Sequence, residues 1–304
     1  MMKNKILCIS FYQSESKGIG LLEKLSCKED VEFVILHGLS SIAKRFCYII
    51  FSGFNSKIVV INYVSLFVVF GFLLRAFGKK VVFVPHEGEP LFPKELKSNI
   101  KYPRKLIASL GLSKFCAKVA TETLPLSMLQ AQMLNIETDK VLRLGVKDDM
   151  FLNELERDGV FFPSRKSESI KGYLRIKKIH SIIINDSSNE LTQTEMYKLY
   201  NSCRVVVIPS IVESYSFSMV ESMLTNCIVV TSEKVGLAYD LMKLFSDDFL
   251  RKSGIYILPD GGCISDFVIK EYKNLIEQQP STRKLALSLG LDGKSSLKIF
   301  ESLL

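Results

Sequence analysis

The sequence is poor in the residues that build metal centres and secreted proteins. Its 304 residues include only three histidines, far apart in the chain, and none of its seven cysteines forms a C-x-x-C pair. Because an odd number of cysteines set in apolar runs is typical of buried thiols, we predict a reducing, cytoplasmic setting and no metal site. The start, MMKNKILCISFY, lacks the long apolar stretch and cleavage site of a signal peptide.

Acidic residues are also in short supply. The chain has 32 Asp and Glu against 40 Lys and Arg, a net charge of +8. This excess predicts an anionic partner, which can be nucleotide phosphate, a membrane surface or nucleic acid. The sequence has no helix-turn-helix, zinc-finger or RNP-type motif, so we expect no nucleic-acid partner.

One stretch, from Lys57 to Lys80, is apolar enough to raise the question of a membrane span. Between Ile58 and Leu74 it is almost wholly apolar, close to the length of a spanning helix. The alternative is a buried strand, a short helix and a second strand. β-branched residues dominate both ends of the stretch, so we favour the strand–helix–strand interpretation.

Apolar strand patterns and helical patterns alternate along the chain. Strands are expected at 5–11, 31–38, 57–64, 79–85, 117–125, 139–146, 159–164, 180–186, 204–210, 227–232 and 254–260. Helices are expected at 18–26, 40–51, 65–78, 126–135, 192–203 and from 217 onwards. The alternation predicts doubly wound α/β sheets with parallel strands.

The length and a polar break at 147–159 divide the pattern into two domains. We predict a first domain over residues 1–150 and a second over residues 151–285. Residues 286–304 are expected to form a C-terminal helix that packs back towards the first domain.

Two carboxylates, Glu213 and Glu221, follow the apolar strand VVVIPS in the stretch VESYSFSMVESM. The loop lies between the end of a strand and the start of a helix, where free backbone N–H groups favour a phosphate or a sugar hydroxyl. Alternatively, Ser218 and Glu221 form a capping box, S-x-x-E, that closes the helix. The spacing alone leaves both possibilities open.

The longer segment PSIVESYSFSMVESMLTNCIVVTS resembles the donor-site motif of glycosyltransferase family 4 and its retaining GT-B relatives. That motif has a Pro-Ser, a Glu, seven residues and a second Glu. The resemblance implies that Glu213 faces the donor sugar and that Glu221 holds the nucleotide ribose. It also implies donor contacts from the loop between them, which departs from the family in lacking its usual glycine. The loop residues are Ser214, Tyr215, Ser216 and Phe217.

The segment PSRKSESIKG resembles the family motif in which an Arg and a later Lys-Gly bind the donor diphosphate. Arg165 and Lys171 match these positions, Ser164 replaces a glycine, and Lys166 is an extra candidate. Fixed cations stabilise the charge that a departing nucleoside diphosphate gains. Taken alone, a basic run in a loop is usually just solvated.

Two segments of the first domain extend the resemblance. SESKGIGLLEKL is similar to the glycine loop near the donor diphosphate, with Gly18 and Gly20 in place of a glycine pair. VVFVPHEGEP places His86 where the family has a histidine near the donor sugar and the reacting centre. The alternative is a strand-end histidine that only bonds the backbone. Glu87 and Glu89 are candidates for contacts with acceptor hydroxyls.

The segment from Lys94 to Lys118 carries many basic residues with apolar residues between them. The ordinary interpretation is a solvated helix face. The sharper one is a basic amphipathic patch that rests on anionic lipid beside the acceptor cleft.

The resemblance implies an α/β protein of the GT-B class, with two Rossmann-like domains facing across a cleft. The second domain is expected to be shortened, because 171–182 is too short for the usual helix, strand and helix. The implied activity moves a hexose from a nucleotide-diphosphate sugar to a glycan or lipid-linked acceptor with retention of configuration. The setting would be synthesis of a bacterial surface polysaccharide or lipopolysaccharide, in the cytoplasm or at the inner face of the plasma membrane. No metal or other cofactor is expected.

The shortened second domain motivates an alternative. The chain can be a catalytically reduced GT-B relative that binds a membrane or a partner enzyme. A nucleotide-sugar epimerase would share the architecture, but its usual carboxylate and histidine set is not recognisable here.

Overall fold

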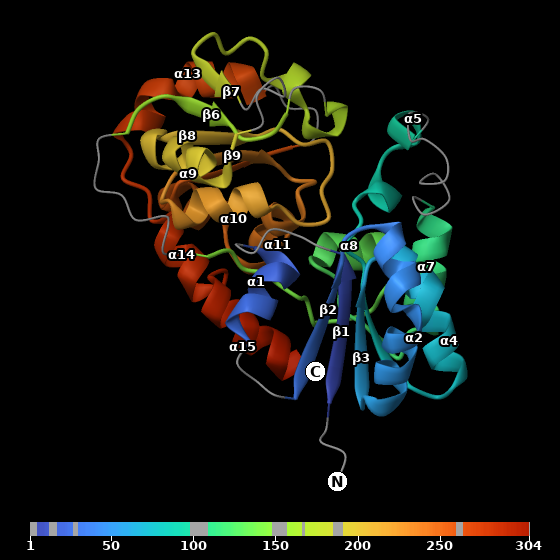
Figure 1. The fold of residues 1–304 in the computed structure, drawn as a ribbon. Helices are drawn as coiled ribbons and strands as arrows, with labels where there is room; N and C mark the ends of the chain where they lie inside the picture. The colour runs from blue at the N-terminus through green and yellow to red at the C-terminus, as the bar shows by residue number, and fades with distance from the viewer. Residues whose placement is uncertain are drawn as a thin grey trace. The chain divides into compact units, whose positions relative to one another are not determined.

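The computed structural model divides the chain into two compact units (Figure 1). It describes residues 5–11, 17–26, 30–97, 109–147, 157–165, 168–184, 191–259 and 264–303. The first unit comprises Met1–Leu144 with Gly293–Leu304, and the second comprises Gly145–Asp292. Each unit is built on its own five-stranded sheet, in which every neighbouring pair of strands is parallel. The predicted class of two Rossmann-like α/β sheets is therefore confirmed.

The sheet of the first unit has the strand order β2-β1-β3-β4-β5. Its strands are β1 (Ile6–Phe11), β2 (Val31–Leu36), β3 (Ile58–Asn62), β4 (Lys80–Val84) and β5 (Glu122–Thr123). The order reverses between β1 and β3. Such a reversal is the point at which doubly wound sheets bind their ligands, at the carboxyl ends of the strands.

Helices cover both faces of this sheet. They are α1 (Gly18–Leu25), α2 (Leu39–Asn55), α3 (Val64–Leu66), the π-helical turn η1 (Phe67–Gly71), α4 (Phe72–Ala76), η2 (Glu89–Leu91), α5 (Lys94–Lys97), α7 (Leu110–Val119), α8 (Met128–Leu134) and α15 (Gly293–Leu303). α2, the α3–α4 helix and α7 enclose an apolar core with alternate strand residues such as Leu7 and Ile9. α1 and α15 cover the other face, where Phe300 of α15 lies against Phe33 of β2 (Figure 1).

The stretch that raised the question of a membrane span forms β3, the α3–α4 helix and β4, as the strand–helix–strand interpretation predicted. Phe67, Phe70 and Leu74 of this stretch are core residues with no exposed surface. Among the helices described, none is both long enough and apolar enough to cross a membrane.

One predicted strand of the first domain is much shorter than expected, and another is wrong. The run 117–125 was expected to be a strand, but α7 continues to Val119 and leaves only the two residues of β5. The run 139–146 forms no strand. Its alternating apolar residues are fully buried, yet its backbone bonds singly to loops, as when Leu142 N–H donates to the Pro125 carbonyl at 2.8 Å. Burial, and not strand pairing, produced the alternation.

The sheet of the second unit repeats the same topology in the order β10-β9-β8-β6-β7. Its strands are β6 (Val160–Phe162), β7 (Ile182–Ile184), β8 (Val205–Ile208), β9 (Ile228–Ser232) and β10 (Ile255–Leu258). Its helices are α9 (Gln193–Ser202), α10 (Phe217–Leu224), α11 (Gly236–Leu244), α12 (Asp247–Ser253), α13 (Ile264–Glu277) and α14 (Thr282–Ser288). The reversal of strand order falls between β6 and β8.

The connection from β6 to β7 is short, as predicted. Two 3₁₀ turns, η3 (Ser169–Lys171) and η4 (Tyr173–Arg175), stand in the described part of this connection where an α-helix is usual. The sheet nevertheless reaches five strands, because the three-residue β7 pairs along its whole length with β6. The sequence analysis expected a shortened second domain, and the structure shows that its sheet still has five strands.

The C-terminal region was predicted as one helix from residue 286. The structure has two, because α14 ends at Ser288 and α15 begins at Gly293. Leu291 N–H donates to the Ala286 carbonyl at 3.0 Å, the pattern of a helix that ends in a tight turn. The unit boundaries fall at 144/145 and 292/293, where the sequence suggested 150/151 and 285/286.

Candidate functional site

The candidate site lies at the carboxyl ends of β6 and β8, the switch point of the second sheet. The loop after β6 carries Arg165 and Lys171, and the loop after β8 carries Ser210 and Glu213. β6 and β8 are parallel neighbours, so both loops leave the same edge of the sheet. The strand order thus gathers residues that lie about 40 positions apart in the sequence.

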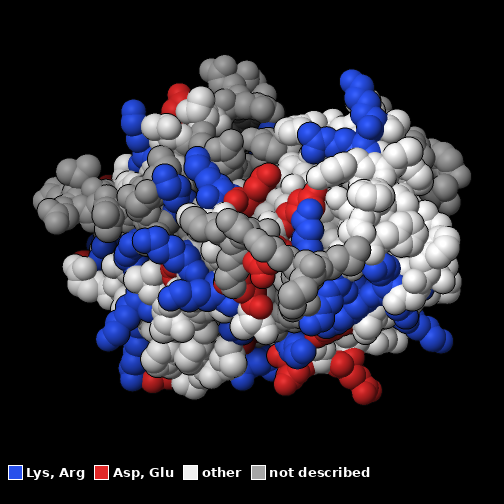
Figure 2. All heavy atoms as spheres, turned by 60° about the horizontal axis from the view of Figure 1, so that its bottom comes forward, with Lys and Arg blue, Asp and Glu red and all other residues white. Residues whose placement is uncertain are grey.

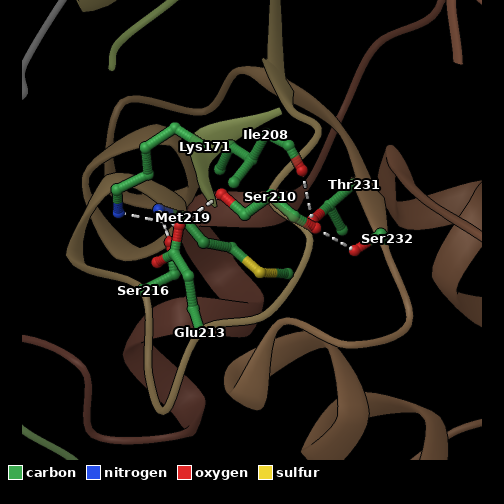
Figure 3. Close-up of polar contacts among 8 residues, drawn as sticks. All are labelled: Lys171, Ile208, Ser210, Glu213, Ser216, Met219, Thr231 and Ser232. Atoms are coloured by element: carbon green, nitrogen blue, oxygen red, sulfur yellow. Dashed lines mark hydrogen bonds and ion pairs between the residues drawn. The ribbon is translucent and has the colours of Figure 1, made fainter. Parts of the chain in front are cut away.

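The centre of this site is an ion pair between Lys171 and Glu213 (Figure 3). Lys171 Nζ lies 2.9 Å from Glu213 Oε1, and the side chains are 26% and 13% exposed. The same carboxylate oxygen accepts a hydrogen bond from Ser210 Oγ. A cation and a carboxylate held side by side can contact a phosphate and a sugar hydroxyl of one ligand. Ser210 had no predicted role, and its only sequence signal was its place in the Pro-Ser step.

The backbone fixes the position of Glu213. Its N–H donates to the Lys234 carbonyl at 3.1 Å, and its carbonyl accepts from Gly236 N–H at 3.0 Å. This single parallel bridge joins the loop after β8 to the loop after β9. Ser232 Oγ also donates to the Ser210 carbonyl at 2.7 Å (Figure 3). The carboxylate therefore projects from a backbone that is held on both sides.

The loop after β6 packs backbone to backbone against the loop after β8. Ile211 N–H donates to the Ile170 carbonyl at 2.9 Å. Gly172, with φ of +74°, lies so close to Pro209 that a Cβ atom would stand 2.1 Å from the Pro209 carbonyl oxygen. Only glycine meets both demands, and this explains the Gly that follows Lys171.

Arg165 stands three residues beyond β6 at the same edge of the sheet and is partly buried. Its carbonyl accepts from Glu168 N–H at 3.2 Å. Lys166, the additional candidate, lies outside the described residues.

The loop between the two glutamates is compact. Ser214, Tyr215 and Ser216 are buried, and the rings of Tyr215 and Phe217 meet edge to face with centroids 5.5 Å apart. Ser216 caps α10 by accepting from Met219 N–H. The capping box expected from Ser218 and Glu221 is therefore wrong, because α10 begins at Phe217, two residues before the start that a cap at Ser218 requires.

Glu221 is 4% exposed and is held by a residue that the sequence analysis missed. Its Oε2 accepts from the hydroxyl of Tyr200 at 2.9 Å. Burial, together with the charge of Glu221, raises the pKa of Tyr200 well above its ordinary value, so the hydroxyl remains a donor. Tyr197 and Tyr200, spaced i and i+3 in α9, were the available signal.

The predicted glycines of the first unit open α1. Gly18 is the first residue of the helix and has φ of +63°. Glycine adopts this conformation readily because it has no side chain. Gly20 lies in the first turn, and both are buried.

His86 follows β4 by two residues, and its ring packs on Tyr63 with centroids 4.9 Å apart. Burial lowers the pKa of His86 to about 4. The ring is therefore neutral at pH 7, when one nitrogen donates and the other accepts.

The carboxylate of Glu87 accepts hydrogen bonds from the N-terminus of α3. It accepts from Val64 N–H at 2.7 Å and Ser65 N–H at 3.3 Å. Burial raises the pKa of Glu87 to about 7, although these hydrogen bonds oppose the shift.

Residues 98–108 of the basic segment 94–118 lie outside the described residues. Of its described lysines, Lys97 donates to the Pro90 carbonyl at 2.8 Å. Basic side chains spread over the face of the molecule drawn in Figure 2, with acidic ones between them. Across the described ranges, no group of three His, Cys, Asp or Glu residues could hold a metal ion.

No protein-family model matches the chain, and no curated protein matches it in sequence. Solved structures do match over nearly the whole length. HepE of Anabaena, solved in complex with UDP, has a TM-score of 0.67 at 13% identity, covering 98% of this chain and 99% of that one. The chain has the GT-B fold.

Two further structures support this conclusion. Sucrose-phosphate synthase of Thermosynechococcus elongatus has a TM-score of 0.68 at 10% identity and covers 98% of both chains. The α,α-trehalose-6-phosphate synthase of Burkholderia multivorans has a TM-score of 0.61 at 8% identity, covering 98% of this chain and 96% of that one. At these identities the likeness concerns the fold alone.

Proposed function

We propose that the protein is a glycosyltransferase that moves a hexose from a nucleotide-diphosphate sugar to a glycan or lipid-linked acceptor with retention of configuration. The observation that carries the proposal is the cluster of Lys171, Ser210 and Glu213 at the switch point of the second sheet. Two of these residues are the ones that the donor-motif resemblance singles out. HepE, which shares the fold, was solved with UDP and with UDP-glucose, and this supports a uridine donor.

In the proposed reaction, Arg165 and Lys171 stabilise the negative charge on the departing nucleoside diphosphate. Glu213 receives the donor sugar, and residues 214–217 line it. Glu221, oriented by Tyr200, accepts from the ribose hydroxyls. The reaction needs no metal, because protein cations supply the positive charge. The acceptor hydroxyl attacks the same face of the sugar and passes its proton to the leaving phosphate.

The first unit supplies the remaining groups. Neutral His86 can exchange hydrogen bonds with a sugar hydroxyl without adding charge. Gly18 and Gly20 allow the donor diphosphate to approach the backbone of α1. The proposed setting is bacterial surface polysaccharide or lipopolysaccharide synthesis in the cytoplasm or at the inner face of the plasma membrane.

Nucleotide binding tests the proposal. UDP, GDP, ADP and CMP are compared by thermal shift, with a ligand at about 100 times its dissociation constant expected to add about 2.7 kcal/mol. We expect one of the four nucleotides to raise the melting temperature, and UDP is the first candidate. Lys171→Ala should weaken that binding about tenfold, the loss of one charge-assisted hydrogen bond. Lys178→Ala is the matched control, because its ion pair with Asp266 is exposed.

Turnover separates the enzyme from its non-catalytic alternative. With the nucleotide sugar that binds, the product anomer is followed by NMR, and Lys171→Ala should lower kcat roughly 100- to 1000-fold. Nucleotide binding without transfer to any glycan or lipid acceptor would favour the catalytically reduced relative. No shift with any nucleotide, or equal losses in both variants, would contradict the proposed site.

A further inference from the structure

Three helices on one face of the first sheet expose large apolar side chains to solvent. The most exposed are Phe51 at the outer side of α2, Phe77 just after α4 and Phe115 on α7, at 70%, 63% and 55%. Phe46, Val68 and Val69 add to them at 37–41%. These six residues are called the apolar helical face. Monomeric proteins rarely leave large apolar groups gathered in this way without a partner.

The face is continuous from helix to helix. The ring of Phe46 on α2 lies 5.5 Å from that of Phe70 in η1, and Phe54 on α2 lies 5.0 Å from Phe77. On the other side, Phe72 of α4 lies 5.6 Å from Phe115 of α7. α2, α4 and α7 also lie together beside the sheet in Figure 1. The exposed residues therefore belong to one layer.

This layer carries positive charge and no negative charge of its own. α2, the α3–α4 helix and α7 contain no Asp or Glu. Lys44, Arg45 and Lys118 are exposed on them, and Lys114 is partly so. Two described carboxylates contact these helices. Glu32 of β2 accepts from Tyr48 of α2 and is paired with Lys5, and Glu87 accepts from Val64 N–H of α3 at 2.7 Å. The partner of this face should therefore be both apolar and anionic.

We propose that the apolar helical face docks the protein on an anionic lipid bilayer. Aromatic and aliphatic side chains flanked by cations are the composition of helices that lie in a membrane interface. Each Lys or Arg near an anionic leaflet adds to the attraction, and the apolar side chains enter the acyl boundary. Of the basic segment that the sequence analysis singled out, this surface includes α7. It does not depend on the transferase reaction.

A second copy of the chain is the main competing occupant. In a two-fold symmetric dimer through this face, Lys44, Arg45 and Lys118 of one copy would approach the same cations of the other. The face offers no carboxylate to offset that repulsion. An anionic bilayer satisfies both the apolar and the cationic groups.

Vesicle sedimentation tests the proposal on the full chain. Vesicles of phosphatidylcholine alone are compared with vesicles that also contain phosphatidylglycerol. Phe51→Ser removes the most exposed ring, and Phe249→Ser, 44% exposed on α12, is its matched control. The double variant Lys44→Gln/Arg45→Gln removes two cations, and Lys294→Gln/Lys298→Gln on α15 is the matched control. Circular dichroism verifies that each variant is folded.

We expect binding to the anionic vesicles only. The two-cation variant should weaken it about 30-fold and Phe51→Ser roughly tenfold, while both controls bind like the wild type. Absence of binding to anionic vesicles would overturn the proposal, as would equal losses in the controls. A dimer in solution that Phe51→Ser converts to a monomer would show that a second copy occupies the face.

Discussion

Two neighbouring residues of the first unit, His86 and Glu87, respond to burial in opposite ways. Burial lowers the pKa of His86 from 6.5 to about 4 and raises that of Glu87 from 4.5 to about 7. Both groups therefore favour their neutral form in the folded protein. The folded state binds fewer protons at His86 than the unfolded chain between pH 4 and 6.5, and more at Glu87 between pH 4.5 and 7.

The two shifts have opposite consequences for stability. Because of His86, the free energy of unfolding decreases as the pH falls from 6.5 to 4. Because of Glu87, it decreases as the pH rises from 4.5 to 7. Glu87→Gln keeps an acceptor for the Val64 and Ser65 N–H groups but removes the titration. The variant should therefore gain stability relative to the wild type across pH 4.5–7, by about 2–3 kcal/mol in all. Urea unfolding at several pH values measures this, and parallel profiles of the two proteins would contradict it.

At the scale of elements, the turn between η3 and η4 determines where Lys171 stands. Gly172→Ala would combine a strained φ with a Cβ atom 2.1 Å from the Pro209 carbonyl oxygen. Gly159→Ala is a matched control, since Gly159 has φ of +82° and nothing within 4 Å of the added atom. We expect the control to cost about 1–2 kcal/mol and Gly172→Ala clearly more. Gly172→Ala should also weaken nucleotide binding, because the loop must move. Equal costs in urea unfolding would contradict the close approach.

The elements also show what the sequence can and cannot predict. Buried parallel strands such as Val205–Ile208 are continuous β-branched runs, and this composition predicted them. The strand predicted at 139–146 is wrong because alternating burial looks the same in the sequence whether the backbone pairs with a strand or with loops. Lys171 and Glu213 were found by resemblance, but not their contact, which depends on the strand order. Tyr200 was missed because its partner, Glu221, lies on another helix.

At the scale of the molecule, the chain returns to its first unit at its end. Phe300 of α15 is fully buried there, and Gly293 packs so closely on α1 that a Cβ atom would meet Leu21 at 2.7 Å. Phe300→Ala should destabilise the first unit by about 3–5 kcal/mol and leave the second unchanged. Hydrogen exchange measures this, with faster exchange expected in β1 and β3 and not in β8 and β9. Leu287→Ala, 40% exposed on α14, is the control. Equal acceleration in both sheets would contradict the division into units.

The return of the chain also makes the second unit an insertion. Its first and last residues are neighbours, since Val146 bridges Asp292 in parallel and Val146 N–H donates to the Leu291 carbonyl at 3.1 Å. A segment whose two ends meet can be exchanged as a cassette without stretching the host that remains. A nucleotide-binding unit from another GT-B protein, joined at 144/145 and 292/293, would leave β1 to β5, α1 and α15 intact. Under the proposed function, such a chimera would separate donor preference from acceptor preference.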